Sequence, residues 1–311
     1  MRAARIHRFG PPDVIVLDDL PRPQPDPDQV LIRVVAAGVG PWDALIREHK
    51  SVVNVPLPFT LGSDLAGVVE SVGSGVHHLK PGNEVYGATN PQFIGGYAEY
   101  ALASASMVAR KPTTLTFEEG ASAPIVAVTA WQMLFDYAKA QAGQSILIHG
   151  AAGNVGAYAV QLARQAGLRV FATASSQDAP FVESLGAEKT VDYKSKRFED
   201  AVPQVDIVLD MVGGETRKRS FHVIKSGGIL VSVVSNEPPE LHAPAAVRSV
   251  FFLVEVTTRR LEKLTELFDH GELKARVGTM LPLDQARKAH EMLGGAPHKG
   301  GKIVLRVADP A

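Results

Sequence analysis

The most informative part of this chain is Ile146-Leu-Ile-His-Gly-Ala-Ala-Gly-Asn-Val-Gly156. Its apolar start is typical of a buried parallel strand. Small residues follow directly, and an apolar pattern with helical spacing continues to Ala166. Gly153 and Gly156 allow backbone to approach a ligand closely, and the free amides at the start of the helix favour a phosphate. Such a glycine pattern is common by itself, but its place between a strand and a helix predicts a dinucleotide-binding turn.

Strands and helices alternate beyond this turn. We expect strands at residues 145–149, 169–174, 205–209, 228–234 and 251–256. We expect helices at residues 154–166, 180–185, 217–224 and 259–270. Alternation at this spacing predicts a doubly wound parallel sheet with helices on both faces, so the fold class is α/β.

The first part of the chain has a different pattern. Strand candidates at 30–35 and 65–72 are separated by frequent proline and glycine, which suits short strands joined by tight turns. The tail adds a helical pattern at 283–293 and an alternating strand at 302–307. We expect this tail to return to the first domain. The predicted organisation is therefore one domain built from residues 1–120 and 272–311, and a second from residues 121–271.

The composition excludes several classes of protein. A net charge of −1 offers no electrostatic attraction to nucleic acid or to an anionic membrane. The chain contains no cysteine, which removes disulfides, thiolate zinc sites and cysteine nucleophiles. No apolar run approaches the ~18 residues that span a bilayer, and the first residues lack a signal-peptide pattern. We expect a cytoplasmic protein.

The strand at 169–174 ends in Ser175-Ser176, where sites selective for NAD carry an acidic residue. The next carboxylate is Asp178. A serine pair tolerates a 2′-phosphate and can hydrogen-bond to it, so the sequence favours NADPH. Lys194, which follows Tyr193, is the nearest candidate to neutralise that phosphate. The alternative is that the two serines only cap the next turn.

Two further loops end strands of the predicted sheet. Asp210-Met-Val-Gly-Gly214 follows one strand, and Ser232-Val-Val-Ser235 ends the next. Ligands of open α/β sheets bind outside the carboxyl ends of the strands, so both loops belong at the predicted site. The glycine pair is equally compatible with an ordinary turn.

Six ordered motifs, spread over nearly the whole chain, resemble zinc-independent medium-chain dehydrogenases/reductases of the quinone oxidoreductase (zeta-crystallin-like) group. The motifs are Gly38-Val-Gly-Pro-Trp-Asp43 with Arg47, Leu61-Gly-Ser-Asp-Leu-Ala-Gly67, Val128-Thr-Ala-Trp131, the turn at Gly150 to Gly156, Leu209-Asp-Met-Val-Gly-Gly214, and Gly301-Lys-Ile-Val-Leu305.

This resemblance implies a GroES-like β-barrel domain, a Rossmann domain, and an active site in the cleft between them. It implies NADPH as hydride donor to quinones or α,β-unsaturated carbonyls, with no metal, and a homodimer whose edge we place at Phe251 to Val256. The expected cofactor residues are Thr129, Ala152, Gly153, Asn154, Val155, Ser175, Ser176, Tyr193, Val212, Val233, Val234, Ser235, Leu253 with Val254, and Lys302. The expected substrate-cleft residues are Gly40, Trp42, Asp43, Leu45 and Asp64.

The chain departs from its relatives at several of these positions. Zinc-dependent relatives carry a His-Glu pair where this chain has Ser63-Asp64, and they use cysteine ligands; a zinc-polarised alcohol is therefore not the expected substrate. Many quinone reductases have Asn at the position of Gly40 and Tyr at that of Leu45. The sequence consequently identifies no proton donor and no catalytic side chain.

For two other polar residues we expect a structural role. Asp43 could form an acid/base pair with Asp64, but we expect it to pair with Arg47 one helical turn away. His149 ends a buried strand, and we expect a hydrogen-bonded core or loop histidine.

Three functions follow from the sequence. The first is direct hydride transfer from NADPH to a quinone or enone, with the hydroquinone anion taking its proton from water. The second is an enoyl-thioester reductase. The third is an NADPH-binding protein of low turnover with a regulatory or structural role, which the missing Asn and Tyr would permit.

Overall fold

The computed structural model describes residues 1–234 and 243–308. The chain forms two compact units: Met1–Ile125 with Val256–Ala311, and Val126–Glu255. The sequence placed the corresponding boundaries after residues 120 and 271. Among the described residues, none of the helices has the length and apolar character that a bilayer-spanning segment needs.

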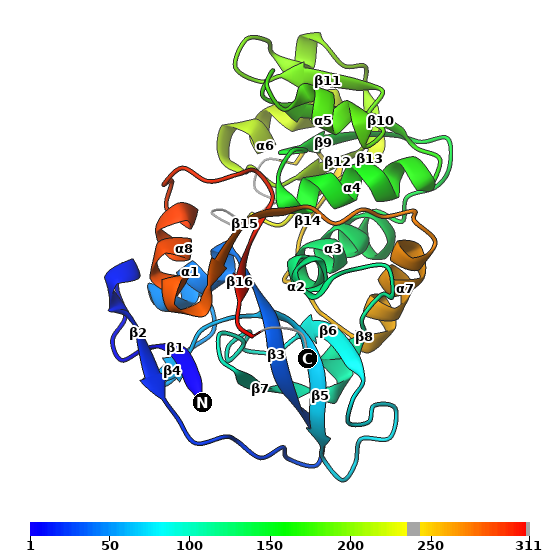
Figure 1. The fold of residues 1–311 in the computed structure, drawn as a ribbon. Coiled ribbons are helices and arrows are strands. Elements are labelled where there is room, and N and C mark those ends of the chain that lie inside the picture. Colours follow the sequence, from blue (N-terminus) through cyan, green and yellow to red (C-terminus); the bar gives the residue numbers. More distant parts are fainter. Residues whose placement is uncertain (235–242, 309–311) are drawn as a thin grey trace. The chain divides into compact units, whose positions relative to one another are not determined.

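The second unit contains a six-stranded sheet in which every neighbouring pair is parallel (Figure 1). Its strand order is β11-β10-β9-β12-β13-β14. The strands are β9 (Ser145–His149), β10 (Arg169–Ala174), β11 (Lys189–Asp192), β12 (Val205–Asp210), β13 (Ile224–Ser232) and β14 (Arg248–Phe251). β9 is buried throughout, as its uninterrupted apolar sequence predicts. The predicted doubly wound α/β sheet is confirmed.

The helices of this unit follow the strands in the predicted alternation. They are α4 (Asn154–Gln165), α5 (Ala179–Ser184) and α6 (Gly214–Ser220), with a 3-10 turn η4 (Phe198–Asp200) before β12 and another, η5 (Phe221–Val223), before β13. The strand order reverses beside β9, because β10 and β12 pair with its two sides. Ligands of such sheets bind at this reversal, outside the carboxyl ends of the strands.

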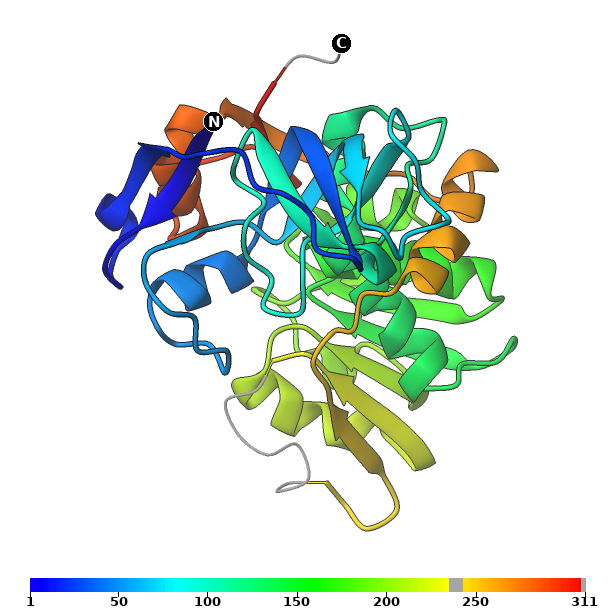
Figure 2. The ribbon, with the colours of Figure 1, turned by 90° about the horizontal axis from the view of Figure 1, so that it is seen from below.

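One strand lies at other residues than the sequence predicts. The strand expected at 251–256 is instead β14 at Arg248–Phe251, which lies beside β13 at one edge of the sheet (Figure 2). The apolar residues after it serve packing: Phe252 is buried and stacks on Tyr137 with ring centroids 4.3 Å apart. A helical stretch precedes the sheet as α3 (Pro124–Trp131) and a π-helix η3 (Gln132–Tyr137).

Helix α7 (Thr258–Asp269) belongs to the first unit, although the sequence analysis assigned its residues to the second domain. Its apolar side, formed by Leu261, Leu264 and Phe268, is buried. The Tyr86 hydroxyl donates to the Leu261 carbonyl oxygen at 2.7 Å. The boundary between the units therefore lies before residue 256 and not after residue 271. The spacing of apolar residues predicts a helix, but it does not show which unit the helix packs in.

The first unit is built mainly on strands. A seven-stranded sheet follows the order β15-β16-β3-β5-β6-β8, with β7 paired to β3, and a smaller sheet has the order β2-β1-β4. The strands are β1 (Arg2–Ile6), β2 (Ile15–Asp19), β3 (Gln29–Val39), β4 (Phe59–Thr60), β5 (Asp64–Val72), β6 (Glu84–Ala88), β7 (Tyr100–Ser104), β8 (Val108–Arg110), β15 (Val277–Pro282) and β16 (Lys302–Arg306).

Short helices complete this unit: α1 (Pro41–Arg47), α2 (Phe117–Ser122) and α8 (Ala286–Leu293), with 3-10 turns η1 (Pro12–Val14), η2 (Ala105–Met107) and η7 (Leu283–Gln285). Strand β16 pairs antiparallel with β3, which joins the end of the chain to its beginning. The register sets Gly38 opposite both Val304 of β16 and Asp64 of β5. Residues from three distant parts of the sequence therefore meet around the start of α1.

Candidate functional site

The glycine turn after β9 joins the strand to α4 at a very short distance. A Cβ atom added to Gly156 would lie 2.3 Å from the Gly150 carbonyl oxygen, so only glycine lets the helix begin this close to the strand. Gly153 is the N-cap of α4, and no side chain among the described residues caps it. The amides of Asn154 and Val155 at the helix start are thus free to bind an anion.

A cavity of about 400 Å³ lies beside this turn, within the second unit. It is lined by His149, Gly150, Ala152, Gly153, Thr173, Ala174, Ser175, Asp178, Tyr193, Lys196, Phe198, Val212, Thr216 and Arg219. These residues follow or end β9, β10, β11 and β12, at the carboxyl edge of the sheet. Five residues predicted from the sequence, Ala152, Gly153, Ser175, Tyr193 and Val212, are therefore brought together here.

The end of β10 differs in detail from the sequence prediction. The Ser175 hydroxyl donates to the Asp178 carboxylate at 2.7 Å, and the Asp178 amide donates back to Ser175 Oγ at 3.3 Å. Ser175 lines the cavity, whereas Ser176 is exposed and does not line it. Lys196 lines the cavity in place of the predicted Lys194, because the turn after β11 carries the chain past Tyr193.

His149 is fully buried, as predicted, and both ring nitrogens are hydrogen-bonded. Nδ1 lies 3.0 Å from Thr173 Oγ1, and Nε2 lies 3.0 Å from Ser220 Oγ. Ser220 uses its proton on the Thr216 carbonyl oxygen at 2.7 Å, so His149 Nε2 donates and Nδ1 accepts. Burial lowers the pKa of His149 to about 4. His149 is a neutral wall of the cavity, a role that its place at the end of β9 could have indicated.

Arg219 and Phe198 are cavity residues that the sequence analysis missed. The Arg219 guanidinium binds the Glu199 carboxylate through two hydrogen bonds, of 2.6 and 2.5 Å, and lies 4.9 Å from the Phe198 ring centroid. The hydrogen bonds from Arg219 lower the pKa of Glu199 to about 2. The positive charge of Arg219 is therefore neutralised by a permanently ionised partner.

Asp210 holds the next two strand ends together. Its Oδ1 accepts hydrogen bonds from the amides of Val212 at 2.9 Å and Gly213 at 2.8 Å, and its Oδ2 accepts the Ser232 hydroxyl at 2.9 Å. Gly213 has φ +77°, which favours glycine, and an added Cβ would lie 2.8 Å from a methyl carbon of Val234. Gly213 therefore lets this loop lie close to Val234 in the segment that follows β13.

The remaining predicted cofactor residues of the second unit differ in burial and lie on different elements. Thr129 is buried in α3, Val233 and Val234 follow β13, and Leu253 lies after β14 with half of its surface exposed. The predicted residue Ser235 lies outside the described residues.

The first unit contains a buried polar cluster around Asp43. The Asp43 carboxylate accepts three hydrogen bonds, from the Gly40 amide at 2.8 Å, the Ser63 hydroxyl at 2.6 Å and the Tyr97 hydroxyl at 3.0 Å. Burial raises the pKa of Asp43 to about 6 against these stabilising contacts. Sequence reasoning could not foresee Ser63 and Tyr97, because they lie 20 and 54 residues away.

The expected pairing of Asp43 with Arg47 is wrong. Arg47 Nη1 lies 2.6 Å from Nδ1 of His290, its Nε donates to the Gly10 carbonyl oxygen, and its other nitrogen pairs with Glu48. The helix-surface rule for residues four apart assumes solvent-exposed side chains, whereas both residues are buried here.

Asp64 forms a buried ion pair with Lys302 at 2.8 Å and also accepts the Ile125 amide at 2.9 Å. Lys302 lies against Gly40, where an added Cβ would be 3.2 Å from the Lys302 ammonium nitrogen. The ammonium group thus borders the space that a side chain at position 40 would occupy. Among the described residues, no three His, Cys, Asp or Glu side chains are grouped as metal ligands.

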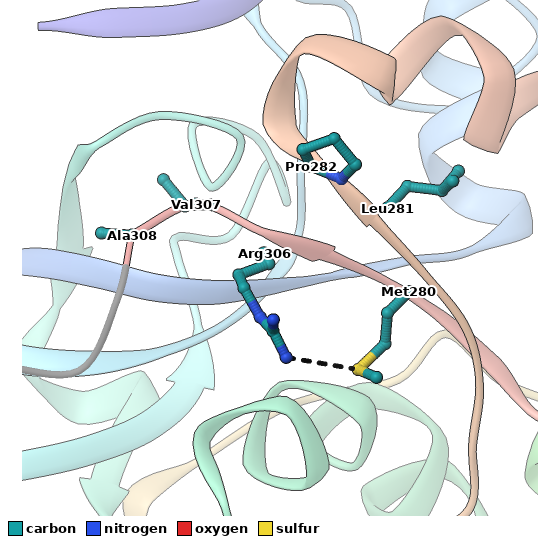
Figure 3. A pocket seen from close by; sticks show the side chains of 6 residues that line it. All are labelled: Met280, Leu281, Pro282, Arg306, Val307 and Ala308. Carbon is teal, nitrogen blue, oxygen red and sulfur yellow. Dashed lines mark hydrogen bonds between the residues drawn. The ribbon is translucent and has the colours of Figure 1, made fainter.

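The other two predicted substrate residues lie on α1. Trp42 packs edge-to-face on Phe93 with centroids 6.0 Å apart, while Leu45 is exposed. A separate hollow of about 320 Å³ is lined by the ends of β15 and β16 and by the residues that follow β16 (Figure 3). Arg306, one of its lining residues, approaches the Met280 sulfur and pairs with Glu118. None of its lining residues was predicted from the sequence.

Comparison with known proteins defines the class. Residues 26–113 match the family described as alcohol dehydrogenase GroES-like domain, and residues 185–305 match that described as zinc-binding dehydrogenase. The name of the second family refers to zinc, but this chain has no cysteine that could serve as a zinc ligand.

Similar whole proteins narrow this class. Quinone oxidoreductase of Mus musculus is 34% identical, with 98% of this chain and 97% of that protein covered. NADPH-dependent alkenal/one oxidoreductase of Arabidopsis thaliana chloroplasts is 34% identical, with 98% and 79% covered. The solved structure of quinone oxidoreductase from Coxiella burnetii is 34% identical, with a TM-score of 0.91 over 99% of both chains. The chain belongs to the zinc-independent quinone oxidoreductase (zeta-crystallin-like) group of medium-chain dehydrogenases/reductases.

Proposed function

We propose that this protein transfers a hydride from NADPH to quinones or α,β-unsaturated carbonyls without a metal ion. The observation that carries the proposal is the cavity at the carboxyl edge of the parallel sheet, which opens beside the uncapped start of α4. The relatives named above as quinone and alkenal/one oxidoreductases support the class of acceptor.

The second unit fits a dinucleotide. Gly156 lets α4 begin close to the end of β9, and the amides of Asn154 and Val155 would hold the pyrophosphate. Ser175, Tyr193 and Lys196 would surround the adenosine ribose. When bound, the dinucleotide supplies the hydride.

The family resemblance assigns the nicotinamide end of the dinucleotide to Thr129, Val212, Val233, Val234, Ser235 and Leu253 of the second unit. It also assigns Lys302, which belongs to the first unit, as a cofactor residue. Asp210 would fix the position of the loop at Val212 relative to β13, because its three hydrogen bonds connect that loop to Ser232.

The first unit would supply the acceptor-side residues Gly40, Trp42, Asp43, Leu45 and Asp64. Neither carboxylate is placed as a ready acid: Asp43 accepts three hydrogen bonds, and Asp64 is paired with Lys302. This arrangement suits quinones, because a hydroquinone anion can take its proton from water. The protein's contribution is then to position the dinucleotide and the acceptor.

The finer predictions of a cytoplasmic homodimer belong to the same proposal. Strand β14 is an edge strand in the described part of the sheet, and an edge strand offers unpaired backbone groups to a second copy.

The test is a turnover assay with purified protein, NADPH and two panels of acceptors, short quinones and enones. The loss of reduced-nicotinamide absorbance is followed, and NADPH binding is measured separately by fluorescence titration. We expect turnover on at least one panel. NADPH binding without turnover on either panel would instead identify a cofactor-binding protein of low turnover. Acyl-CoA enones are assayed in parallel, and turnover on them that is faster than on both panels would identify an enoyl-thioester reductase.

A further inference from the structure

A buried ion pair of the first unit crosses a strand that lies between its two partners. Lys302 begins β16 and Asp64 begins β5, and β3 lies between these strands (Figure 1). The Lys302 ammonium nitrogen nevertheless lies 2.8 Å from Asp64 Oδ2. The crossing is possible because β3 carries Gly38 at this point, where an added Cβ would be 2.9 Å from Asp64 Cβ and 3.0 Å from Lys302 Cε. The missing side chain at position 38 therefore fixes where the ammonium group lies.

The Lys302 ammonium group has more donors than this ion pair uses. An ammonium carries three N–H donors. Within residues 1–234 and 243–308, its hydrogen bond is the one to Asp64 Oδ2, and the other oxygen of Asp64 accepts the Ile125 amide at 2.9 Å. The Lys302 side chain is buried, and buried donors without an acceptor are costly. Two donors therefore remain for an oxygen atom that the described part of the protein does not supply.

The space beside this ammonium group is open at Gly40. The backbone of Gly40 is extended, with φ −141° and ψ 167°, so its conformation does not require glycine. Apart from its chain neighbours, an added Cβ would have two atoms of the described residues within 4 Å: Lys302 Nζ at 3.2 Å and Asp43 Oδ2 at 3.9 Å. A ligand oxygen at that point would lie within hydrogen-bond distance of the ammonium nitrogen.

These contacts favour a ligand oxygen that accepts a hydrogen bond. Asp43 Oδ2 already accepts the Gly40 amide at 2.8 Å and the Tyr97 hydroxyl at 3.0 Å, while its Oδ1 accepts the Ser63 hydroxyl at 2.6 Å. The lone pairs of Oδ2 are thus in use, and a ligand hydroxyl would find little to donate to. The Lys302 ammonium, in contrast, has donors to offer to a carbonyl oxygen.

We propose that Lys302 is a catalytic residue whose ammonium group donates a hydrogen bond to the carbonyl oxygen of the quinone or enone, in the space beside Gly40. This differs from the family assignment of Lys302 as a cofactor residue, because the oxygen that it binds belongs to the acceptor. The inference rests on the proposed function, which supplies the hydride and the acceptor.

The charge that Lys302 stabilises follows from the electron balance of the reaction. Hydride addition forms a C–H bond at the β-carbon of an enone and oxidises the nicotinamide. The C=C electron pair moves to the neighbouring bond, the C=O pair moves onto oxygen, and the resulting enolate takes a proton from water. With a quinone, the same oxygen becomes the hydroquinone anion. A donor already fixed at this oxygen stabilises the negative charge as it develops.

The first experiment compares kcat/KM for the acceptor with the dissociation constant of NADPH. Gly40→Ala puts a methyl group where the oxygen would lie, and it keeps Lys302 with its ion pair. We expect kcat/KM for the acceptor that the unmutated chain reduces fastest to fall by about tenfold to a hundredfold, while NADPH affinity stays unchanged. Gly294→Ala is the matched control and should change neither quantity, because Gly294 is exposed and has φ −77° in the same unit.

The second experiment removes the ammonium group and measures binding without turnover. Lys302→Met combined with Asp64→Leu leaves neither charge buried without its partner. The unmutated chain and the double variant are saturated with NADP⁺ and titrated with 4-nitrophenolate, an anion followed by its visible absorbance, and with 4-nitroanisole, which has the same ring without the charged oxygen. We expect the double variant to lose about tenfold to a hundredfold in affinity for 4-nitrophenolate relative to 4-nitroanisole, and to keep its affinity for NADPH.

Either of two results would overturn the inference: an unchanged kcat/KM in Gly40→Ala, or an unchanged preference for 4-nitrophenolate in the double variant. Loss of NADPH affinity in the double variant, with that preference unchanged, would make Lys302 a cofactor residue instead. Failure of the unmutated chain to bind NADPH would defeat the proposed function, on which the inference rests.

Discussion

Replacing Gly156 with alanine tests the dinucleotide turn most sharply. The new methyl carbon would lie 2.3 Å from the Gly150 carbonyl oxygen and 2.7 Å from the Ala151 Cα, and real Cβ contacts are essentially never below 3.0 Å. The start of α4 must therefore move by at least about 0.7 Å relative to the end of β9. Both opposing atoms belong to backbone, so no side chain can rotate away to relieve the overlap.

The expected magnitude has two parts. Overpacking costs about 1–3 kcal/mol of folding stability, and the gain in helix propensity from Gly to Ala offsets about 1 kcal/mol of this. The displaced amides weaken at least one hydrogen bond to a charged phosphate, worth about 1.5–3 kcal/mol. We therefore expect NADPH affinity to fall by about tenfold to a hundredfold, with a modest loss of stability.

The assay combines NADPH titration with urea denaturation of the unliganded protein. Gly294→Ala is the control, because Gly294 has φ −77° and its added Cβ would be 3.3 Å from the nearest atom outside its chain neighbours. Unchanged NADPH affinity in a folded Gly156→Ala protein would refute the placement of the pyrophosphate at this turn. Equal losses of affinity in both variants would show a general effect of the substitution instead.

Three other predictions concern the first unit and the assembly. Burial raises the pKa of Asp43 from 3.8 to about 6, so the folded state binds this proton more tightly than the unfolded state does. The free energy of unfolding should therefore fall by about 3 kcal/mol as the pH rises from 4 to 6. Asp43→Asn should remove that part of the pH dependence in denaturation curves, and an identical dependence would contradict it. Lys302→Met should destabilise by about 3–5 kcal/mol because it leaves Asp64 buried without its partner, whereas the double variant Lys302→Met with Asp64→Leu should recover much of this; equal stability of the two would count against the buried pair. Sedimentation should show a dimer that Val250→Lys in edge strand β14 weakens, and a monomer at all concentrations would rule the dimer out.

The sequence located the elements best where a single periodicity governs burial. The bounds of β9 and β10 agree with the expectation, because each is a short apolar run closed by small or polar residues. The expectation failed at Phe252 and Val256, which are buried outside any strand. Apolarity shows that a side chain is buried but does not specify the backbone that carries it.

The sequence predicted the glycine turn of the candidate site, but it did not predict the hydrogen-bond and ion-pair partners of the site's polar residues. Residues next to the turn follow from chain direction, since strands of a parallel sheet end at one edge. The partners of Asp43, Arg47 and Ser175 depend on tertiary contacts or on the local course of a turn. Asp178 was visible as the nearest carboxylate, but only the fold shows that it holds Ser175 inside the cavity.

The central claim is direct hydride transfer from the dinucleotide to a carbon acceptor. It is tested most directly by a reaction with NADPH deuterated at nicotinamide C4, prepared separately with the label on each face, and a simple enone. We expect one labelled form, and not the other, to deliver deuterium to the β-carbon of the saturated product. Product formation with no deuterium from either form would contradict direct transfer, and NADPH binding without any product would contradict the reductase function itself.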